Sequence, residues 1–246
     1  MANATGDAVA QVGPAARTGR PTGIPWAAGL LVLFWFGGFM AFLDSPDAQV
    51  LGATVRIFYI HVAVAWLAGL AFLVNWMGSI LYLVRRDLRV DRWAAVSAEI
   101  GEVFTTAVLV TGSIWARVAW NTWWTWDPRL TTALVMWFLY LAYLVLREGV
   151  SRPESRAAVS AVVGIVAFVD VPVVFLSTRW WRSIHPVIEQ NGTFALSPHM
   201  LLAMFAMLAA VTAFYVYILR LRVRQEAARD AIEAMRLRLR SRGETS

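Results

Sequence analysis

Two histidines and one tryptophan-rich loop are the features of this sequence that suggest chemistry. His61 lies in the segment RIFYIHVAVAW, and His185 lies in the segment STRWWRSIHPV. The loop over 119–132, AWNTWWTWDPRLTT, holds four tryptophans within seven residues: Trp120, Trp123, Trp124 and Trp126. Neutral imidazole is a common ligand of metals, and aromatic side chains stack on flat aromatic groups. The pattern predicts a site for a flat ligand that contains a metal.

Each of these features also has a simpler interpretation. A single histidine at a membrane surface is often only a polar residue that meets water, and tryptophans gather in belts at both surfaces of a bilayer. Belts place tryptophans singly at the ends of spans, whereas this loop places four together. The spacing therefore favours a surface that covers an apolar ligand.

The elements that position these residues are membrane-spanning helices. Of the 246 residues, 59% are hydrophobic and only 15% are charged, which is outside the usual range of soluble domains. Six apolar runs are long enough to cross the hydrocarbon core as helices. They cover about 24–43, 57–84, 94–116, 130–146, 157–177 and 199–219. We expect an all-α integral membrane protein with six transmembrane helices.

The distribution of arginine predicts the orientation of these helices. The sequence has no lysine, so all 22 basic side chains are arginines. With both termini on one side, that side holds 17 arginines and the opposite side holds five: Arg56, Arg117, Arg129, Arg179 and Arg182. Positive residues accumulate on the cytoplasmic side. Both termini are therefore expected in the cytoplasm, and the tryptophan-rich loop, all three histidines and seven of the 13 tryptophans are expected on the outer face.

The six spans form one domain between two tails. We expect 1–23 to be a disordered cytoplasmic tail, 24–222 to be the transmembrane domain and 223–246 to be a basic cytoplasmic helix. In the last segment, apolar residues recur at helical spacing: Ala228, Ile232, Met235 and Leu239. Such a helix lies on anionic lipid or docks a partner subunit, and the sequence does not choose between the two.

Haem b is the ligand that suits the outer residues. Its iron takes histidine ligands, its faces stack on aromatic rings and its propionates pair with arginine. The chain has no cysteine, so it contains neither a C-x-x-C-H haem-attachment motif nor a thiolate metal site. We therefore expect haem to be held transiently and without a covalent bond, by two of the outer histidines. A free divalent metal fits less well, because the outer carboxylates are few.

Four acidic residues need separate explanations. Asp127, followed by Pro128, is typical of a helix start with Asp as the N-cap, and we favour this structural role over a catalytic one. Asp170 lies inside the fifth span, where an acid is costly and usually faces a partner. Glu99 and Glu102 share one helix face. We expect them to pair with Arg85, Arg86 or Arg92, and a pathway for protons or haem is the alternative role.

Three motifs together resemble a known family. The segment WNTWWTWDPRLT, with VTGSIW ahead of it, is similar to the WWD signature of haem-handling proteins in cytochrome c biogenesis. RIFYIHV and STRWWRSIH resemble the two histidine segments that flank this signature in the haem exporter protein C family, also called cytochrome c maturation protein C. The resemblance covers about 24–222. It departs from the signature at Asn121, where glycine is usual, and at Pro128, where a small residue is usual.

The resemblance assigns roles to individual residues. It implies that His61 and His185 are the axial ligands of haem. It also implies a haem-facing loop of four tryptophans and one acid: Trp120, Trp123, Trp124, Trp126 and Asp127. We expect the remaining haem-binding residues on the same outer face: Trp115, Trp180, Trp181, Arg56 and Arg129.

The resemblance also implies a function. Proteins of that family hold haem at the outer, periplasmic face of the cytoplasmic membrane and pass it to a membrane-anchored haem chaperone. An ATP-binding cassette transporter and a small single-span subunit belong to the same complex, and the absence of lysine excludes a P-loop from the present chain. The implied function is haem transfer without an enzymatic site, and nothing in the sequence suggests a nucleic-acid partner.

Three alternatives to this function remain. A haem lyase of the same signature class is larger and has additional spans and histidines. A b-type cytochrome subunit needs histidines inside its spans, usually at two depths, and none of the six apolar runs has an interior histidine. A solute transporter finds its main support in Asp170.

Overall fold

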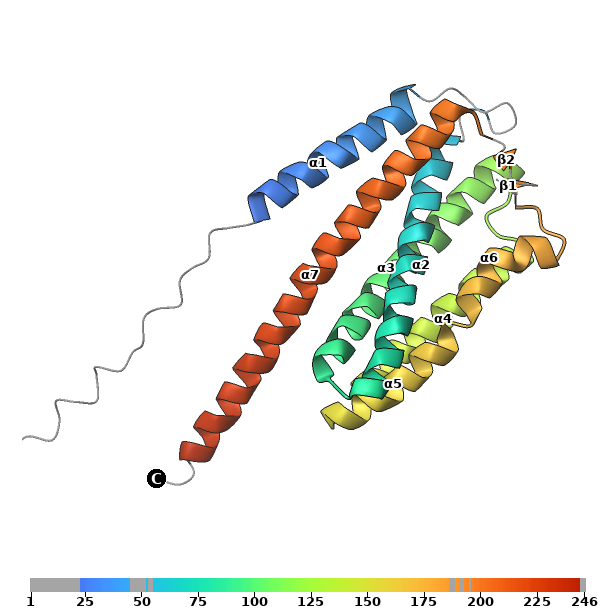
Figure 1. The fold of residues 1–246 in the computed structure, drawn as a ribbon. Coiled ribbons are helices and arrows are strands. Elements are labelled where there is room, and N and C mark those ends of the chain that lie inside the picture. The colour runs from blue at the N-terminus through green and yellow to red at the C-terminus, as the bar shows by residue number, and fades with distance from the viewer. Residues whose placement is uncertain are drawn as a thin grey trace, which may run out of the picture.

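The fold consists of six membrane-crossing helical segments. A computed structural model describes residues 23–44, 52, 55–185, 189–190, 193–194 and 196–243. Six segments in this part of the chain are long and apolar enough to span a bilayer: Pro25–Asp44, Val55–Arg85, Leu88–Trp120, Pro128–Glu148, Pro153–Trp180 and Pro198–Ser241. The expected all-α integral membrane fold with six spans is therefore confirmed (Figure 1). The N-terminal tail that we expect to be disordered lies, up to residue 22, outside the described residues.

Of the six spans, the first four and the last are continuous helical segments, and the fifth is divided into two helices. α1 (Gly23–Phe39) continues through a π-helical turn (Met40–Asp44), and the long helices α2 (Val55–Arg85) and α3 (Leu88–Trp120) follow. The next two spans are α4 (Pro128–Glu148) and the pair α5 (Pro153–Ala167) and α6 (Asp170–Trp180). The two-residue strands β1 (Glu189–Gln190) and β2 (Thr193–Phe194) pair antiparallel before α7 (Pro198–Gly243).

The helices extend beyond the apolar runs that predict them. α3 begins at Leu88 and ends at Trp120, whereas its apolar run covers only 94–116. Asp87 caps the start of α3 by accepting a hydrogen bond from the backbone N–H of Arg89 at 2.8 Å. Hydropathy detects only the part of a helix that lies in hydrocarbon, so the polar first and last turns are missed.

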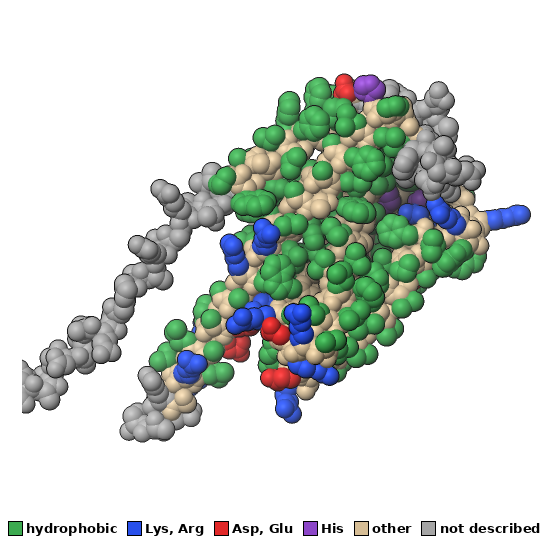
Figure 2. Space-filling model, viewed as in Figure 1, with side chains coloured by type: hydrophobic (Ala, Val, Ile, Leu, Met, Phe, Trp, Pro, Cys, Tyr) green, Lys and Arg blue, Asp and Glu red, His purple; other side chains and the backbone are tan. Residues whose placement is uncertain are grey.

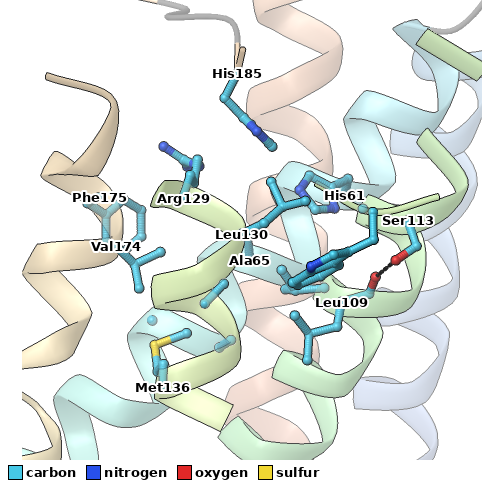
Figure 3. Close-up of a pocket in the computed structure, with 16 residues that line it drawn as sticks. His61, Ala65, Leu109, Ser113, Arg129, Leu130, Met136, Val174, Phe175 and His185 are labelled. Atoms are coloured by element: carbon cyan, nitrogen blue, oxygen red, sulfur yellow. Dashed lines mark hydrogen bonds between the residues drawn. The ribbon is translucent and has the colours of Figure 1, made fainter. Parts of the chain in front are cut away.

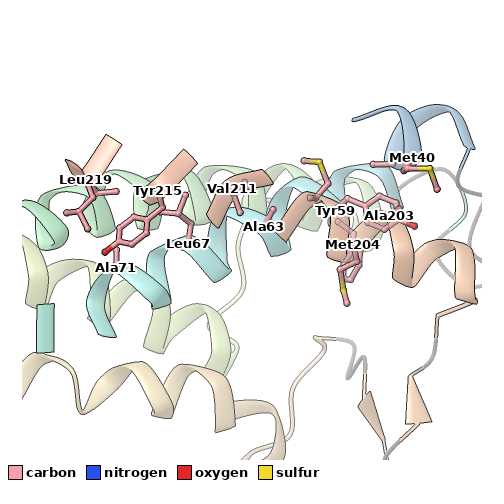
Figure 4. Packing of buried hydrophobic residues seen from close by; sticks show 14 of the residues in the cluster. Met40, Tyr59, Ala63, Leu67, Ala71, Ala203, Met204, Val211, Tyr215 and Leu219 are labelled. Atoms are coloured by element: carbon pink, nitrogen blue, oxygen red, sulfur yellow. The ribbon is translucent and has the colours of Figure 1, made fainter. Parts of the chain in front are cut away.

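A core between α2 and α7 holds the first and last spans to the rest. Buried side chains of α2, among them Tyr59, Leu67 and Ala71, belong to one cluster with Met204 and Tyr215 of α7 (Figure 4). α1 packs mainly against α7, at the edge of the bundle (Figure 1). A second cluster joins α4 and α6 to α2 and α3. The first cluster holds the histidine-bearing start of α2, whereas the second cluster reaches α2 at Phe72, below the level of His61.

The fifth span is broken near its middle. α5 ends at Ala167, Phe168 and Val169 interrupt the helix, and α6 starts at Asp170. Pro172 explains the break, because its ring clashes with the carbonyl of the residue four positions earlier and it has no N–H to donate. Asp170 therefore lies in the first turn of α6, where an acid suits the helix dipole. Its Oδ2 atom is buried, and no hydrogen-bond partner for it occurs among the described residues.

Charged side chains gather at the end of the bundle opposite the tryptophan-rich loop (Figure 2). Arg147 of α4 donates two hydrogen bonds to the carboxylate of Asp91 on α3. Glu99 of α3 pairs with Arg222 of α7 at 2.8 Å, so our expectation that Glu99 pairs with Arg85, Arg86 or Arg92 is wrong. The partner comes from a helix 123 positions away in sequence, which spacing along α3 does not reveal.

The remaining acids of this end differ from each other in their surroundings. Arg92 pairs with Asp230 of α7. The carboxylate oxygens of Glu102 are buried and have no hydrogen-bond partner within the described chain. α7 runs through this charged end without interruption, and the apolar side chains of Ile232, Met235 and Leu239 are exposed on its last turns.

The Asp91–Arg147 pair is expected to stabilise the fold more than the Arg92–Asp230 pair. Asp91→Ala leaves the largely buried Arg147 guanidinium without its partner, and the expected loss in the free energy of unfolding is about 3 kcal/mol. Asp230→Ala removes an acid whose side chain is 59% exposed, and the expected loss is below about 1 kcal/mol. Denaturant unfolding in detergent micelles, followed by tryptophan fluorescence, compares the two variants. Equal losses would contradict this ranking.

Candidate functional site

His61 lies in the second turn of α2, and its hydrogen bond determines which ring nitrogen is free. Nδ1 of His61 is 2.9 Å from Oγ1 of Thr111 on α3. The Thr111 hydroxyl donates its single hydrogen to the carbonyl of Ala107 at 2.7 Å, so it accepts from His61. Nδ1 therefore carries the proton, and the lone pair of Nε2 is available to a metal.

Gly112 provides the space that the His61 ring occupies. A Cβ atom built on Gly112 would lie 3.1 Å from Cε1 of His61, which is closer than most such contacts in proteins. A larger residue at this position would push the imidazole or α3 aside. The pair Thr111 and Gly112 thus sets both the tautomer and the position of His61.

His185 is positioned by Asp127, although the two residues are far apart in sequence. The carboxylate of Asp127 accepts a hydrogen bond from the Ser183 hydroxyl and another from the Ile184 backbone N–H, both at 2.9 Å. It also accepts from the backbone N–H of Arg129 at 2.9 Å, so the expected N-cap role at the start of α4 is confirmed. One buried carboxylate thereby joins the tryptophan-rich loop, α4 and the segment that ends in His185.

The surroundings of His185 keep its imidazole neutral. Burial lowers the pKa of His185 to about 3, and the positive charge of Arg129 and the nearby His61 also lower it, whereas Asp127 acts in the opposite direction. Nδ1 of His185 is buried and has no hydrogen-bond partner among the described residues. A neutral imidazole with an unused ring nitrogen is the form that ligates metals.

Trp115 and Trp120 bring the two histidines together. The ring centroid of Trp115 lies 6.0 Å from that of His61 and 5.6 Å from that of His185. Trp120 lies 5.4 Å from both Trp115 and His185. Trp115 is only 2% exposed, so it is a wall of the site rather than a belt residue.

The other predicted tryptophans divide between the cavity and the surface. Trp124 lines the cavity described below. Trp123 and Trp126 are 60% and 76% exposed, and Trp180 and Trp181 are also exposed. The structure therefore gathers three of the seven predicted tryptophans around the histidines and leaves four on the outside of the same end of the bundle.

A partly open cavity lies below the histidines, between α2, α3, α4 and α6 (Figure 3). His61, His185 and Arg129 lie at its upper end, and Met136 and Val174 lie at its lower end. The remaining walls are mostly small or aliphatic: Ala65, Ala68, Gly69, Val108, Leu109, Leu130 and Ala133. These wall residues could not be recognised from the sequence, because on a membrane helix an apolar residue that faces a cavity resembles one that faces lipid.

The predicted arginines have three different environments. Arg129 faces the cavity beside both histidines (Figure 3). Arg117 instead supports the loop, since it donates to the backbone carbonyl and side-chain oxygen of Asn121 at 2.9 and 2.7 Å and lies over the Trp123 ring. Arg56 is half-buried in the first turn of α2 and does not line the cavity.

The two departures from the signature fit the local backbone. Asn121 ends α3 with φ 57° and ψ 27°, the left-handed conformation that glycine and asparagine adopt most readily. Pro128 occupies the first turn of α4, where its missing N–H costs nothing. Neither residue displaces a candidate ligand.

The third histidine lies elsewhere. His199, in the first turn of α7, is 3.8 Å from Oδ2 of Asp44, and both side chains are exposed.

The site thus combines two imidazoles, an aromatic wall, one guanidinium and an apolar pocket. This set suits a flat aromatic ligand that contains a metal and has an acidic edge, and no group of three or more His, Cys, Asp or Glu side chains that could hold a free metal ion occurs in the described chain.

Comparison with known proteins identifies related sequences over most of the chain. A sequence model of the family described as heme exporter protein C matches residues 16–238. The protein named heme exporter protein C from Bradyrhizobium diazoefficiens is 33% identical over 222 residues, which are 89% of this chain and 84% of that protein. The protein of the same name from Rhodobacter capsulatus is 30% identical over 87% of this chain and 90% of its own length. The one from Escherichia coli K12 is 32% identical over 66% of each chain.

Asp127→Ala is expected to loosen the His185 segment as well as α4. The substitution removes an N-cap and two further hydrogen bonds, and the expected loss in the free energy of unfolding is about 2 kcal/mol. Hydrogen exchange at 181–185 should accelerate. The control is Asp87→Ala, which removes the N-cap of α3 at the other end of the bundle. If exchange at 181–185 accelerates equally in both variants, Asp127 does not position His185.

Proposed function

Because the chain belongs to the haem exporter protein C family, we propose that it binds haem b between His61 and His185 and delivers it to a membrane-anchored haem chaperone. The family relation itself supports the coarser statement that this multi-pass membrane protein handles haem in cytochrome c maturation. The observation that carries the finer proposal is the pair of imidazoles at one cavity. Among the described residues, Nδ1 of His185 has no hydrogen-bond partner, and the hydrogen bond of the His61 ring uses Nδ1 and leaves Nε2 available.

The chemistry of the cavity supports haem as the cargo. Histidine nitrogens ligate haem iron, and the Trp124 ring lines the cavity, where it offers an aromatic contact to a porphyrin. Trp115 and Trp120 pack against the histidine rings and hold them in place. Arg129 beside the histidines suits a propionate. The aliphatic walls below suit the apolar edge of the macrocycle. Haem thus finds a partner for each of its chemical parts.

Release of haem is part of the proposed function, and the chain has features that allow it. It has no cysteine that could form a thioether bond, so coordination and contact are the means of holding haem. Trp123 and Trp126 are exposed on the loop that borders the site. Exposed aromatic residues are frequent anchors of protein interfaces, so we assign these two tryptophans to docking of the chaperone rather than to the cavity wall.

The proposed location is the outer, periplasmic face of the cytoplasmic membrane. The arginine distribution supports this orientation, because the charged end of the bundle lies opposite the histidines (Figure 2). All three histidines lie at one end of the described bundle, which disfavours a cytochrome that passes electrons across the bilayer. We propose that ATP-binding cassette subunits and a small single-span subunit complete the complex and supply the ATP step.

The histidine assignment is tested by spectroscopy of the purified protein. We expect His61→Ala and His185→Ala each to abolish the Soret absorbance of co-purified haem, because one axial ligand is lost in each. His199→Ala is the control, since this exposed histidine lies beside Asp44, away from the cavity. Wild-type absorbance in either of the first two variants would overturn the proposed ligation.

The role of Thr111 is tested by a substitution of similar shape. Thr111→Val removes the acceptor of the His61 Nδ1 proton, and the expected loss of haem affinity is about 10–100-fold, as is usual for such hydrogen-bond partners of metal ligands. Thr105→Val is the matched control on the same helix, because Thr105 bonds only to the Gly101 carbonyl one turn earlier. Haem titration of the apo-proteins measures both affinities, and equal affinities would show that Thr111 does not orient His61.

A further inference from the structure

One side of the cavity is not closed by helix packing. α2 packs along α3, α3 packs against α4, and α4 packs against α6. Within the described residues, α2 and α6 do not pack closely against each other. In the view shared by Figures 1 and 2, histidine and arginine surface is visible in a recess between these two helices, among apolar side chains. The cavity therefore has a lateral opening that faces the surroundings of the bundle.

The break in the fifth span creates this opening. α5 packs against both α2 and α4, whereas within the described residues α6, after the break, packs closely against α4 but not against α2. Phe168, at the break, stacks on Trp76 of α2 with ring centroids 5.0 Å apart, and this contact closes the lower corner. Above it the two helices diverge.

Phe175 is the side chain that stands in the opening. It lines the cavity and is nevertheless 47% exposed, so it faces both the cavity and the outside. A Cβ atom built on Gly69 of α2 would lie 3.4 Å from the Phe175 ring, which places the ring against the opposite edge. Gly69 and Phe175 lie within the apolar runs 57–84 and 157–177, so the opening faces lipid rather than water.

The route into the cavity from the charged end of the bundle is blocked. Below the cavity floor, Phe72 of α2 and Tyr140 of α4 stack with ring centroids 3.5 Å apart. Both side chains are completely buried. A flat molecule as large as a porphyrin cannot pass this pair without separating α2 from α4. At the lateral opening, by contrast, the partly exposed ring of Phe175 lies between α6 and Gly69 of α2.

We propose that haem enters the cavity sideways from the lipid bilayer, between α2 and α6, with Phe175 as the gate. The inference rests on the proposed function, since it concerns the haem that His61 and His185 would hold. A membrane-dissolved amphiphile suits this entrance, because its apolar edge passes between apolar helix faces. Its acidic edge stays at the level of Arg129, at the upper end of the cavity. The gate residue acts on the rate of loading rather than on ligation.

The chain offers a specific way to block the entrance after folding. It has no cysteine, so Phe175→Cys provides a single thiol for a bulky methanethiosulfonate reagent that a reductant later removes. The labelled protein, in phosphatidylcholine vesicles, receives haem added to the vesicles, and stopped-flow absorbance follows the Soret band. We expect loading about tenfold slower than in the unlabelled variant, with the same final spectrum, and recovery after reduction.

Two further labelled variants locate the route. Gly38→Cys places the same label on α1, where no atom lies within 4 Å of a built Cβ, and loading should be unchanged. Arg182→Cys places it on the exposed segment beside the tryptophan-rich loop, where haem from water would enter. Slower loading from the label at position 182 but not at position 175 would overturn the lateral entrance.

A substitution without a label provides an independent check. Gly69→Leu fills the opening from the α2 side, and we expect slower loading of haem. Loading at the wild-type rate would contradict the proposal. If the wild-type protein shows no haem spectrum that depends on His61 and His185, the proposed function is refuted instead. The two failures are therefore distinguishable.

Discussion

The carboxylate of Asp127 is the interaction on which the site depends. It accepts hydrogen bonds from the backbone of α4 and from two groups of the segment that carries His185. In a bilayer, the backbone of each span is satisfied within its own helix, so the spans have no backbone bonds with which to orient the loops between them. Side-chain acceptors at the helix ends must therefore orient these loops. Asp127 is buried, and its loss would leave the backbone N–H of Ile184 without its acceptor.

The two histidines are held by different means, and this difference suits a carrier. His61 is placed by helix packing, by the Thr111 hydroxyl and by the space over Gly112, all within the α2–α3 pair. His185 lies on a short segment outside the spans, attached through Asp127. A ligand held between a rigid and a more weakly attached imidazole can be released by movement of one side. A fully rigid pair would bind haem more tightly and release it less readily.

The broken fifth span has consequences for both ends of the cavity. A proline in the middle of a span costs hydrogen bonds that a soluble helix would recover from water. Here the break lets α5 cover α2 in one half of the bundle and α6 cover α4 in the other half. The half that contains the histidines is consequently open on one side. The hydrogen bonds that the break costs thus accompany an opening into the cavity, and the break adds no stability of its own.

Much of this architecture follows from the sequence alone. Apolar length predicts six spans, the Asp–Pro pair predicts the start of α4, and the arginine count predicts an orientation that remains a prediction. The motifs around His61, His185 and the tryptophan-rich loop predict the family. Each of these properties depends on composition or on residues that are close together in the chain. Both can be read directly from the sequence.

The tertiary structure decided which of these residues meet. It placed Trp115, Trp120 and Trp124 at the site and left Trp123 and Trp126 exposed, although all five are close in sequence. It paired Glu99 with Arg222 rather than with a nearby arginine, and it opened the cavity beside Phe175. Hydropathy cannot separate these cases, because lipid, a neighbouring helix and an apolar cavity all accept the same side chains. Only the crossing of helices distant in sequence distinguishes them.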